Sequence, residues 1–454
     1  MNRSDTIIAP ATASGEAGIA IIRITGADAL SALLRYFIPT GIHPELQTHR
    51  LYHGLLRDRS ESIIDEVMAV YMAAPHSYTR DDVVEIQCHG SQQVVKSILN
   101  LYQGDGLRLA EPGEFTYRAF MNGRLDLSQA EAVSQLIHAK TDSSRKLALQ
   151  QMTGALSREI YSFTAELKKI LVSIEAWIDF PEEDLPAENL SNFISTLSEI
   201  KSKIQVITDS YTCGRVLSEG ASILLVGQPN AGKSSLMNAL LGEERAIVTD
   251  VPGTTRDYLE EGVTINGVPV SLVDTAGLRE SVDAVEVEGI RRTEQKLALS
   301  DLVLLVVDAS RPPDELDYSA LESCSGLSTF VVFTKIDKNV HNNINSFCGF
   351  PTYSVSSKTA EGLDSLRSGI STFLVEDYSS ADETVMLTER RHFQALQCSL
   401  EPIDKALVVC RDVSHLELLA FDIREALYFL GQISGETTTE AVLDDVFSGF
   451  CIGK

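Results

Sequence analysis

Short alternating runs of apolar and polar residues occupy the first part of the chain, and helical periodicity follows them. Residues 17–24 and 83–88 show the two-residue alternation of strands with one buried face. One or two helical patterns accompany these strands, so residues 1–121 predict an α+β domain. Apolar residues then recur at helical spacing over residues 127–177, and Ser128 and Glu131 have the spacing of a capping box. This second region predicts long bundle helices.

The rest of the chain alternates between helical and strand patterns. A loop is expected at residues 179–188, a further helical pattern at 190–212, a polar linker at 376–383 and renewed helical periodicity at 387–430. Short apolar runs between these helical regions predict buried strands at 223–226, 268–273, 331–334 and 352–355. The pattern predicts a multidomain fold in which an α/β domain is inserted into an all-α domain formed from two chain segments. The expected bounds are 1–121 for the α+β domain, 122–215 and 379–454 for the helical domain, and 216–378 for the insertion.

Composition restricts the class of protein. A length of 454 residues is typical of two or three domains. No segment has membrane-spanning length, and seven cysteines without framework spacing are expected to be reduced thiols in the cytoplasm. The net charge of −26 repels nucleic acid over most of the surface. An RNA ligand would therefore need a local basic patch or a partner protein.

Residues 227–234 have the pattern G-x-x-x-x-G-K-S between an apolar run and a helical pattern. A glycine-rich turn between a strand and a helix directs backbone N–H groups and the positive end of the helix dipole at an anion. Lys233 is expected to reach the β and γ phosphates of a nucleotide, and Ser234 to ligate Mg²⁺. The segment predicts a phosphate-binding loop.

Three later motifs indicate which nucleotide is bound. Residues 274–277 (Asp-Thr-Ala-Gly) end a strand, where a carboxylate can hold the Mg²⁺ shell through water and a glycine N–H can face a γ-phosphate. Residues 334–337 end another strand, and the carboxylate of Asp337 can accept both N–H groups of a guanine edge, which adenine cannot match. Residues 356–358 supply a loop over the base. GTP is therefore predicted, although Thr334 stands where such motifs usually have Asn.

Five short segments outside these motifs are distinctive, at residues 5–9 (DTIIA), 18–23 (GIAIIR), 112–115 (PGEF), 122–127 (NGRLDL) and 450–454 (FCIGK). With them, the whole chain resembles the tRNA-modification GTPase family called MnmE or TrmE. The resemblance implies GTP hydrolysis coupled to adding a (carboxymethyl)aminomethyl group at carbon 5 of the wobble uridine. It also implies a homodimer, a tetrahydrofolate donor (5-formyl- or methylene-tetrahydrofolate), and a flavoprotein partner, MnmG, that carries FAD and joins a heterotetramer-type complex.

Hydrolysis needs a group other than the usual glutamine. Small GTPases commonly place a water-orienting Gln directly after the D-x-x-G motif, and Leu278 stands there instead. An apolar side chain cannot orient water, so the transition-state charge needs other help. The side-chain oxygen of Asn230 is able to ligate a monovalent cation beside the phosphates. Asn is also a common turn former, which remains an alternative for this residue.

The resemblance assigns this cation and extends the site. It implies a K⁺ ion held by Asn230, Thr249, Val251 and Thr254, and a Mg²⁺ ion held by Ser234 and Thr255. Glu286 matches the residue that positions water through a second water, and Arg279 and Thr254 are expected to assist; a solvated helix face is the alternative for Glu286. The residues expected to contact GTP are Asn230, Ala231, Gly232, Lys233, Ser234, Ser235, Thr249, Asp250, Val251, Pro252, Gly253, Thr254, Thr255, Asp274, Thr275, Ala276, Gly277, Thr334, Lys335, Ile336, Asp337, Ser356, Ser357 and Lys358.

The resemblance also implies a folate site and a participating thiol. The folate residues fall on Arg23, Glu85, Arg124 and Lys454. Arginine suits the carboxylates of folate, and a carboxylate can accept paired N–H donors of the pterin. Cys451 lies in the terminal segment, where a thiolate could take part in the modification. Inert packing is the alternative for this cysteine.

Two other functional classes share part of these features. A regulatory GTPase of ribosome assembly has the same GTP motifs and also lacks the Gln, but it is expected to carry a basic RNA-binding domain. A folate-dependent one-carbon transferase with a regulatory GTPase domain would need neither tRNA nor a flavoprotein. Neither alternative accounts for the distinctive segments at both ends of the chain.

Overall fold

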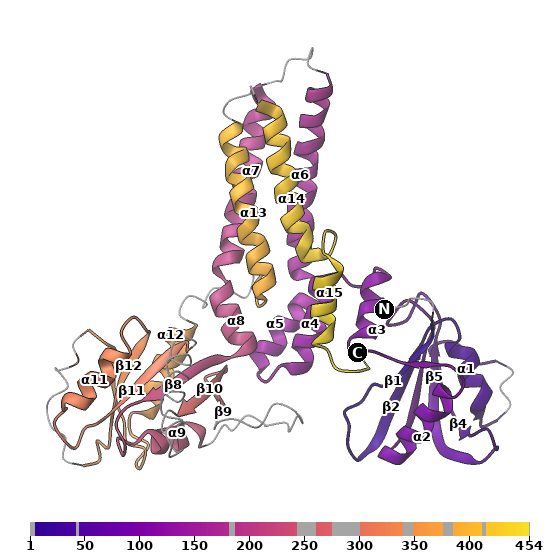
Figure 1. The fold of residues 1–454 in the computed structure, drawn as a ribbon, viewed down its shortest axis with the longest axis horizontal. Coiled ribbons are helices and arrows are strands. Elements are labelled where there is room, and N and C mark those ends of the chain that lie inside the picture. Colours follow the sequence, from indigo (N-terminus) through magenta and orange to yellow (C-terminus); the bar gives the residue numbers. More distant parts are fainter. Residues whose placement is uncertain are drawn as a thin grey trace, which may run out of the picture. The chain divides into compact units, whose positions relative to one another are not determined.

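The computed structural model describes residues 5–41, 45–180, 187–242, 260–274, 300–338, 347, 349–375, 385–410 and 415–453. Figure 1 shows its helices and strands. The chain forms two compact units, each made from stretches that are distant in sequence. One unit comprises residues 1–134, 151–168 and 427–454, and the other comprises residues 135–150 and 169–426.

A seven-stranded sheet forms the main part of the first unit within the described residues, in the order β3-β4-β5-β6-β2-β1-β7. Its pairs are antiparallel except β1 with β7, which is parallel. From Val84 onward in β6 the buried and more open positions alternate, as the sequence pattern predicts for residues 83–88. The strands are β1 Ile7–Pro10, β2 Ala17–Thr25, β3 Phe37–Pro39, β4 Leu51–Arg57, β5 Ile63–Met72, β6 Val83–Gly90 and β7 Arg108–Leu109.

Three helices accompany this sheet among the described residues: α1 Ala29–Tyr36, α2 Gln92–Gln103 and α3 Glu114–Met121. Leu33, Ile98 and Tyr102 are buried in one core with the inner face of the sheet. The expectation of one or two helices was wrong, because α1 and α3 each have eight residues and are too short to show a clear helical period. The α+β class of this region is confirmed.

The first helices after this domain differ in detail from the prediction. The continuous helical pattern is divided into α4 Leu127–His138, α5 Asp142–Met152 and α6 Ala155–Asp179. The capping box lies two residues earlier than predicted. Asp126 Oδ1 accepts the Gln129 N–H at 2.9 Å, and Gln129 Oε1 accepts the Asp126 N–H at 3.0 Å. Ser128 is inside the first turn and donates its hydroxyl to Asp126, so it cannot act as the cap.

The remaining helices of the all-α region come from both flanks of the inserted domain. They are α7 Ala187–Asp209, α8 Tyr211–Glu219, α13 Arg390–Val409, α14 Leu416–Ser434 and α15 Glu440–Ser448. Helix α13 contacts both α7 and α8. Helical structure therefore continues to Glu219, beyond the predicted end near residue 212, and α13 tolerates Pro402 in its interior. The predicted linker at 376–383 lies outside the described residues.

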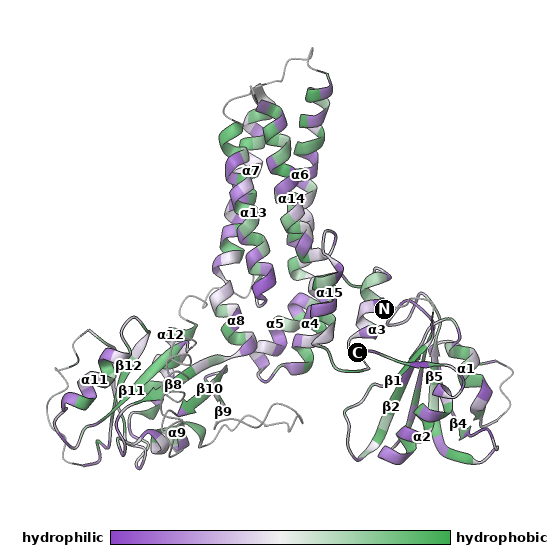
Figure 2. Cartoon of the chain, viewed as in Figure 1, coloured by the Kyte–Doolittle hydropathy of each residue, from purple (hydrophilic) through white to green (hydrophobic). Residues whose placement is uncertain are grey.

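The inserted domain has a six-stranded sheet among the described residues, in the order β13-β12-β11-β8-β10-β9. All pairs are parallel except β9 with β10, and Figure 2 shows its central strands as hydrophobic. Its elements are β8 Ala221–Val226, α9 Lys233–Leu241, β9 Glu260–Ile265, β10 Val268–Asp274, β11 Leu302–Asp308, α11 Glu315–Ser323, β12 Thr329–Thr334, β13 Thr352–Ser354 and α12 Leu363–Leu374. The predicted multidomain class, with an α/β GTPase domain between two helical segments, is confirmed. In the described part of the chain, every helix is too short or too polar to cross a membrane.

Candidate nucleotide and folate sites

The phosphate-binding loop joins β8 to α9 at the carboxyl end of the parallel sheet. Gly227 has a φ of 149°, and a Cβ there would lie 2.3 Å from the carbonyl oxygen of Val306, so only glycine fits. Lys233 begins α9, is 6% exposed, and donates from Nζ to the carbonyl oxygens of Gly227 at 3.0 Å and Gln228 at 2.9 Å. These contacts hold the lysine against the loop whose backbone N–H groups are expected to bind phosphates.

Ser234, a predicted Mg²⁺ ligand, lies beside Asp274, which is predicted to hold the Mg²⁺ shell through water. The Ser234 hydroxyl donates to Asp274 Oδ2 at 3.0 Å. This contact arises because β8 and β10 are parallel neighbours, with Asp274 opposite Leu225 in register. A hydroxyl and a carboxylate oxygen are the hard ligands that Mg²⁺ prefers, so the described residues fit this ion. Thr255, the other predicted ligand, lies outside the described residues.

The base-reading segment follows β12 and contacts the phosphate loop. Lys335 has a φ of 61°, and its Nζ donates to the Asn230 carbonyl oxygen at 2.6 Å. The Ser356 hydroxyl donates to Asp337 Oδ1 at 2.9 Å and accepts the Lys358 N–H at 3.3 Å. The loop that begins at Ser356 therefore orients the carboxylate expected to read guanine.

Thr334 is 2% exposed and has a structural role that its position in the motif did not reveal. Its hydroxyl is within hydrogen-bonding distance of the carbonyl oxygens of Ala231 and, at 3.2 Å, Val307. A hydroxyl has one proton, so both carbonyls compete for it and no donor remains for a base. An asparagine amide has two N–H donors and could hold the loop and the nucleotide together.

Thr334→Asn is therefore expected to strengthen GDP binding about fivefold, the value of one added hydrogen bond. The affinity is measured by titration with a fluorescent GDP analogue. Thr334→Ser keeps the single hydroxyl and should bind like the unmodified chain. Unchanged affinity in a folded Thr334→Asn variant would contradict this account.

Several predicted nucleotide, metal and catalytic residues lie outside the described part of the chain, and they stay predictions. They are Thr249, Asp250, Val251, Pro252, Gly253, Thr254, Thr255, Thr275, Ala276, Gly277, Arg279 and Glu286. Lys454 of the predicted folate set also lies outside it. Among the described members, Asn230 has a φ of 63° at an exposed position, where its amide oxygen suits a monovalent cation.

Arg23 and Glu85 form the centre of the second predicted site. The two residues are opposite each other on β2 and β6, and Arg23 Nε and Nη2 lie 2.9 Å and 2.8 Å from Glu85 Oε1. Both side chains are largely buried, at 15% and 19% exposure. The structure thus brings these two predicted residues together although they are far apart in sequence.

Two aromatic rings lie beside Arg23, and the sequence did not predict either of them for this site. The Arg23 guanidinium lies 5.4 Å from the Tyr78 ring centroid and 5.6 Å from that of Phe115. The Arg124 guanidinium lies 4.7 Å from the same Tyr78 ring, so Tyr78 joins the two predicted arginines. Phe115 belongs to the distinctive PGEF segment, and this position in the sequence could have indicated that it lies at the site. Tyr78 belongs to no distinctive segment, so nothing in the sequence indicated its place.

The C-terminal segment contacts this site within the same compact unit. Arg23 Nη1 donates to the Gly453 carbonyl oxygen at 3.4 Å, and the Gly113 N–H donates to the Cys451 carbonyl oxygen at 3.4 Å. A Cβ on Gly453 would lie 2.0 Å from the Pro10 carbonyl oxygen, so the backbone approaches too closely for any other residue. Cys451 is exposed and follows Phe450, which is buried beside Phe447.

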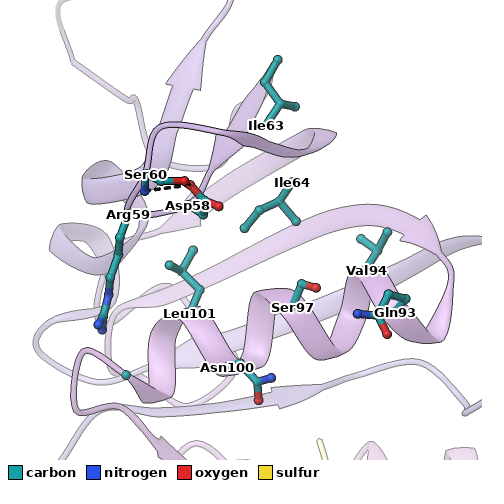
Figure 3. A pocket seen from close by; sticks show the side chains of 11 residues that line it. Asp58, Arg59, Ser60, Ile63, Ile64, Gln93, Val94, Ser97, Asn100 and Leu101 are labelled. Atoms are coloured by element: carbon teal, nitrogen blue, oxygen red, sulfur yellow. Dashed lines mark hydrogen bonds between the residues drawn. The ribbon is translucent and has the colours of Figure 1, made fainter.

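A separate cleft of about 730 Å³ lies between α2 and the β4–β5 turn. Figure 3 shows Ser97 and Leu101 on the helix, with Asp58 and Ser60 on the turn across from them. None of the residues that line this cleft is among those predicted to bind nucleotide or folate.

Family models and curated relatives match nearly the whole chain. The model of the GTP-binding protein TrmE N-terminus matches residues 6–124, and the model of the MnmE helical domain matches residues 127–451. The tRNA modification GTPase MnmE of Syntrophotalea carbinolica is 44% identical over 100% of both chains. The chain belongs to the MnmE family. The predicted resemblance is thereby confirmed.

Two further proteins are similar to this chain over different shares of its length. The MnmE of Geobacter sulfurreducens is 43% identical over 99% of both chains. A crystal structure of the G domain of the T. maritima FeoB iron transporter is 30% identical, with a TM-score of 0.27, and covers 34% of this chain and 98% of its own. As a member of the MnmE family, the chain is a GTP-hydrolysing enzyme of tRNA modification.

Proposed function

We propose that this enzyme takes part in adding a (carboxymethyl)aminomethyl group at carbon 5 of the wobble uridine, with 5-formyl- or methylene-tetrahydrofolate as the one-carbon source. The observation that carries the proposal is the Arg23–Glu85 pair, which meets the C-terminal segment at the Gly453 carbonyl. The pair proposed to bind folate and the segment that contains Cys451 belong to one compact unit.

The chemistry of this site suits a folate. The two guanidinium groups of Arg23 and Arg124 can pair with its carboxylates, and Glu85 can accept N–H donors of a pterin. The rings of Tyr78 and Phe115 beside Arg23 offer flat apolar surface to an aromatic ligand. Residues of both charges beside aromatic rings therefore fit the cofactor that the family resemblance implies.

Cys451 is the proposed participating thiol of the C-terminal segment. Its carbonyl is held by the Gly113 N–H, while its side chain remains exposed. A fixed backbone with an open thiol suits a residue that meets a substrate rather than one that fills a core. Lys454 is the last proposed folate residue, one position beyond Gly453.

Potassium is proposed to support GTP hydrolysis. Asn230 would hold the ion together with Thr249, Val251 and Thr254, and Ser234 and Thr255 would hold Mg²⁺ with Asp274 acting through water. Bound potassium would supply the positive charge that an arginine finger otherwise brings to the phosphates. Glu286 is the proposed residue that positions the attacking water through a second water, since Leu278 cannot orient water. Arg279 is proposed to order the same segment, and Thr254 to assist as a ligand of the potassium ion.

The proposed assembly has two levels. The chain would dimerise through the N-terminal domain, and the dimer would join MnmG, an FAD-containing flavoprotein, in a heterotetramer-type complex that acts on tRNA in the cytoplasm. The domain bounds proposed for it are 1–121, 122–215 with 379–454, and 216–378. A partner protein is consistent with the net charge of −26, which disfavours RNA binding by this chain alone.

Mass spectrometry of wobble uridines tests the proposal. Cells that lack this chain are expected to lose the carbon-5 group, and the intact chain is expected to restore it fully. Cys451→Ser should leave GTP hydrolysis intact and fail to restore the group, whereas Cys398→Ser, which changes another exposed cysteine, should restore it. Unchanged uridines in the deleted cells would contradict the proposal and favour a regulatory switch, and full restoration by Cys451→Ser would exclude the thiol.

A further inference from the structure

Asp308 ends strand β11 and contacts the base-reading segment, although no GTPase motif discussed above contains it. Its Oδ2 accepts from Lys335 Nζ at 2.6 Å. The same ammonium donates to the Asn230 carbonyl oxygen at 2.6 Å. The contact follows from topology, because β11 and β12 are parallel and Asp308 is opposite Thr334 in register. One lysine thereby links a strand end, the base-reading segment and the phosphate loop.

Both carboxylate oxygens of Asp308 are engaged. Oδ1 accepts the backbone N–H of Ser310 at 2.9 Å and its hydroxyl at 2.6 Å, which leaves Oδ2 for Lys335. Burial raises the pKa of Asp308, but the hydrogen bonds from Lys335 and Ser310 outweigh burial, and the pKa lies below its ordinary value. The carboxylate is therefore ionised at neutral pH and forms an ion pair with a side chain that is 28% exposed.

We propose that Asp308 is a positioning residue for guanine nucleotides: it holds the Lys335 ammonium on the carbonyl of Asn230 and so ties the base-reading segment to the phosphate loop. Lys335 and Asn230 both have positive φ, at 61° and 63°, which few non-glycine residues adopt without support. The ammonium between them stabilises both turns at once. A nucleotide that contacts both segments would then dissociate only when this link loosens.

Replacing Asp308 by asparagine removes the negative charge and changes little else in the side chain. Asparagine keeps Oδ1 for Ser310 and the shape of the side chain, but its amide nitrogen cannot accept from Lys335. GDP is expected to dissociate about tenfold faster from Asp308→Asn, a smaller effect than for a fully buried pair because water partly screens this one. The rate is measured by displacing a fluorescent GDP analogue with excess GDP. Neither tRNA nor a partner protein is present, so the outcome is independent of the modification chemistry.

Asp301→Asn is the matched control. Asp301 precedes the other end of the same strand and pairs with Arg215, with side-chain exposures of 28% for the arginine and 21% for the aspartate. This variant should lower the thermal stability to a similar extent and leave GDP release unchanged. Equal release rates for Asp308→Asn and the unmodified chain, or equal acceleration by both variants, would overturn the proposal.

Two further variants test whether Asp308 acts by positioning Lys335 or only by filling space in the domain. Asp308→Glu is larger but keeps the charge, so it should release GDP more slowly than Asp308→Asn. In a Lys335→Ala background, the same Asp308→Asn change should have less than about a twofold effect, because its partner is gone. A full tenfold effect in that background would show that Asp308 does not act through Lys335.

Discussion

Replacing Asn230 by alanine is expected to abolish the stimulation of GTP hydrolysis by potassium and to lower turnover in potassium about 100- to 1000-fold. The change removes the amide oxygen proposed to hold the ion, and Leu278 offers no substitute for orienting water. Phosphate release is measured in potassium chloride and in sodium chloride at equal ionic strength. Comparable turnover of the unmodified chain in the two salts would contradict the role of potassium.

A control variant must distinguish the loss of the Asn230 amide oxygen from the backbone strain that alanine introduces. Asn230 has a φ of 63°, where alanine is strained and glycine is not. Asn230→Gly therefore also removes the amide but relaxes the backbone, and it should lose the potassium response as fully. Asn266→Ala places alanine at a φ of 49° elsewhere in the same domain and should keep the response. A potassium response retained by Asn230→Gly would show that the side chain is not a ligand.

Arg23→Ala is expected to weaken the binding of 5-formyltetrahydrofolate about 100-fold without changing GTP hydrolysis. The variant removes a charged partner for the carboxylates of the ligand, and it also leaves Glu85, at 19% exposure, without its 2.8 Å ion pair. The unpaired carboxylate then repels an anionic ligand. Isothermal titration calorimetry measures the affinity, unchanged GTP hydrolysis shows that the GTPase domain is intact, and an unchanged circular dichroism spectrum shows that the N-terminal domain is folded.

Arg35→Ala is the matched control on the same domain. Arg35 is 52% exposed and forms an ion pair with Asp105, but it does not belong to the proposed folate site. Folate affinity should remain within about twofold of the unmodified chain, because exposed pairs contribute little. Equal losses in the two variants would indicate a general effect on the domain, and unchanged affinity in Arg23→Ala would remove Arg23 from the site.

Local patterns predicted the strand, loop and helix that carry the phosphate-loop motif. The phosphate loop needs eight consecutive residues between a strand and a helix, and the structure has β8, Lys233 and α9 in that arrangement. Ser234 and Asp274 are distant in sequence but meet because parallel strands end at the same edge of a sheet. Motif positions at strand ends therefore predicted that both residues would lie near one Mg²⁺ site, but not that they would contact each other directly.

Contacts that depend on the path of the whole chain were missed. The hydroxyl of Thr334 binds the Ala231 carbonyl, and no propensity indicates which backbone group will lie beside it. Tyr78 lies between Arg23 and Arg124 because a loop of the N-terminal domain packs against the segment after α3. The capping box was also misplaced, since two overlapping patterns compete near the start of α4 and only the hydrogen bonds of Asp126 decide between them.

The sequence by itself determined the order of the α+β, helical and GTPase regions, the GTPase motifs and the family, because these depend on the spacing of residues that are near one another in the chain. Only the tertiary structure decided that the Gly453 carbonyl meets Arg23 and that Asp308 holds Lys335. These contacts join residues 430 and 27 positions apart. Their free energy depends on how sheets and helices bring distant backbone groups together, which residue spacing does not specify.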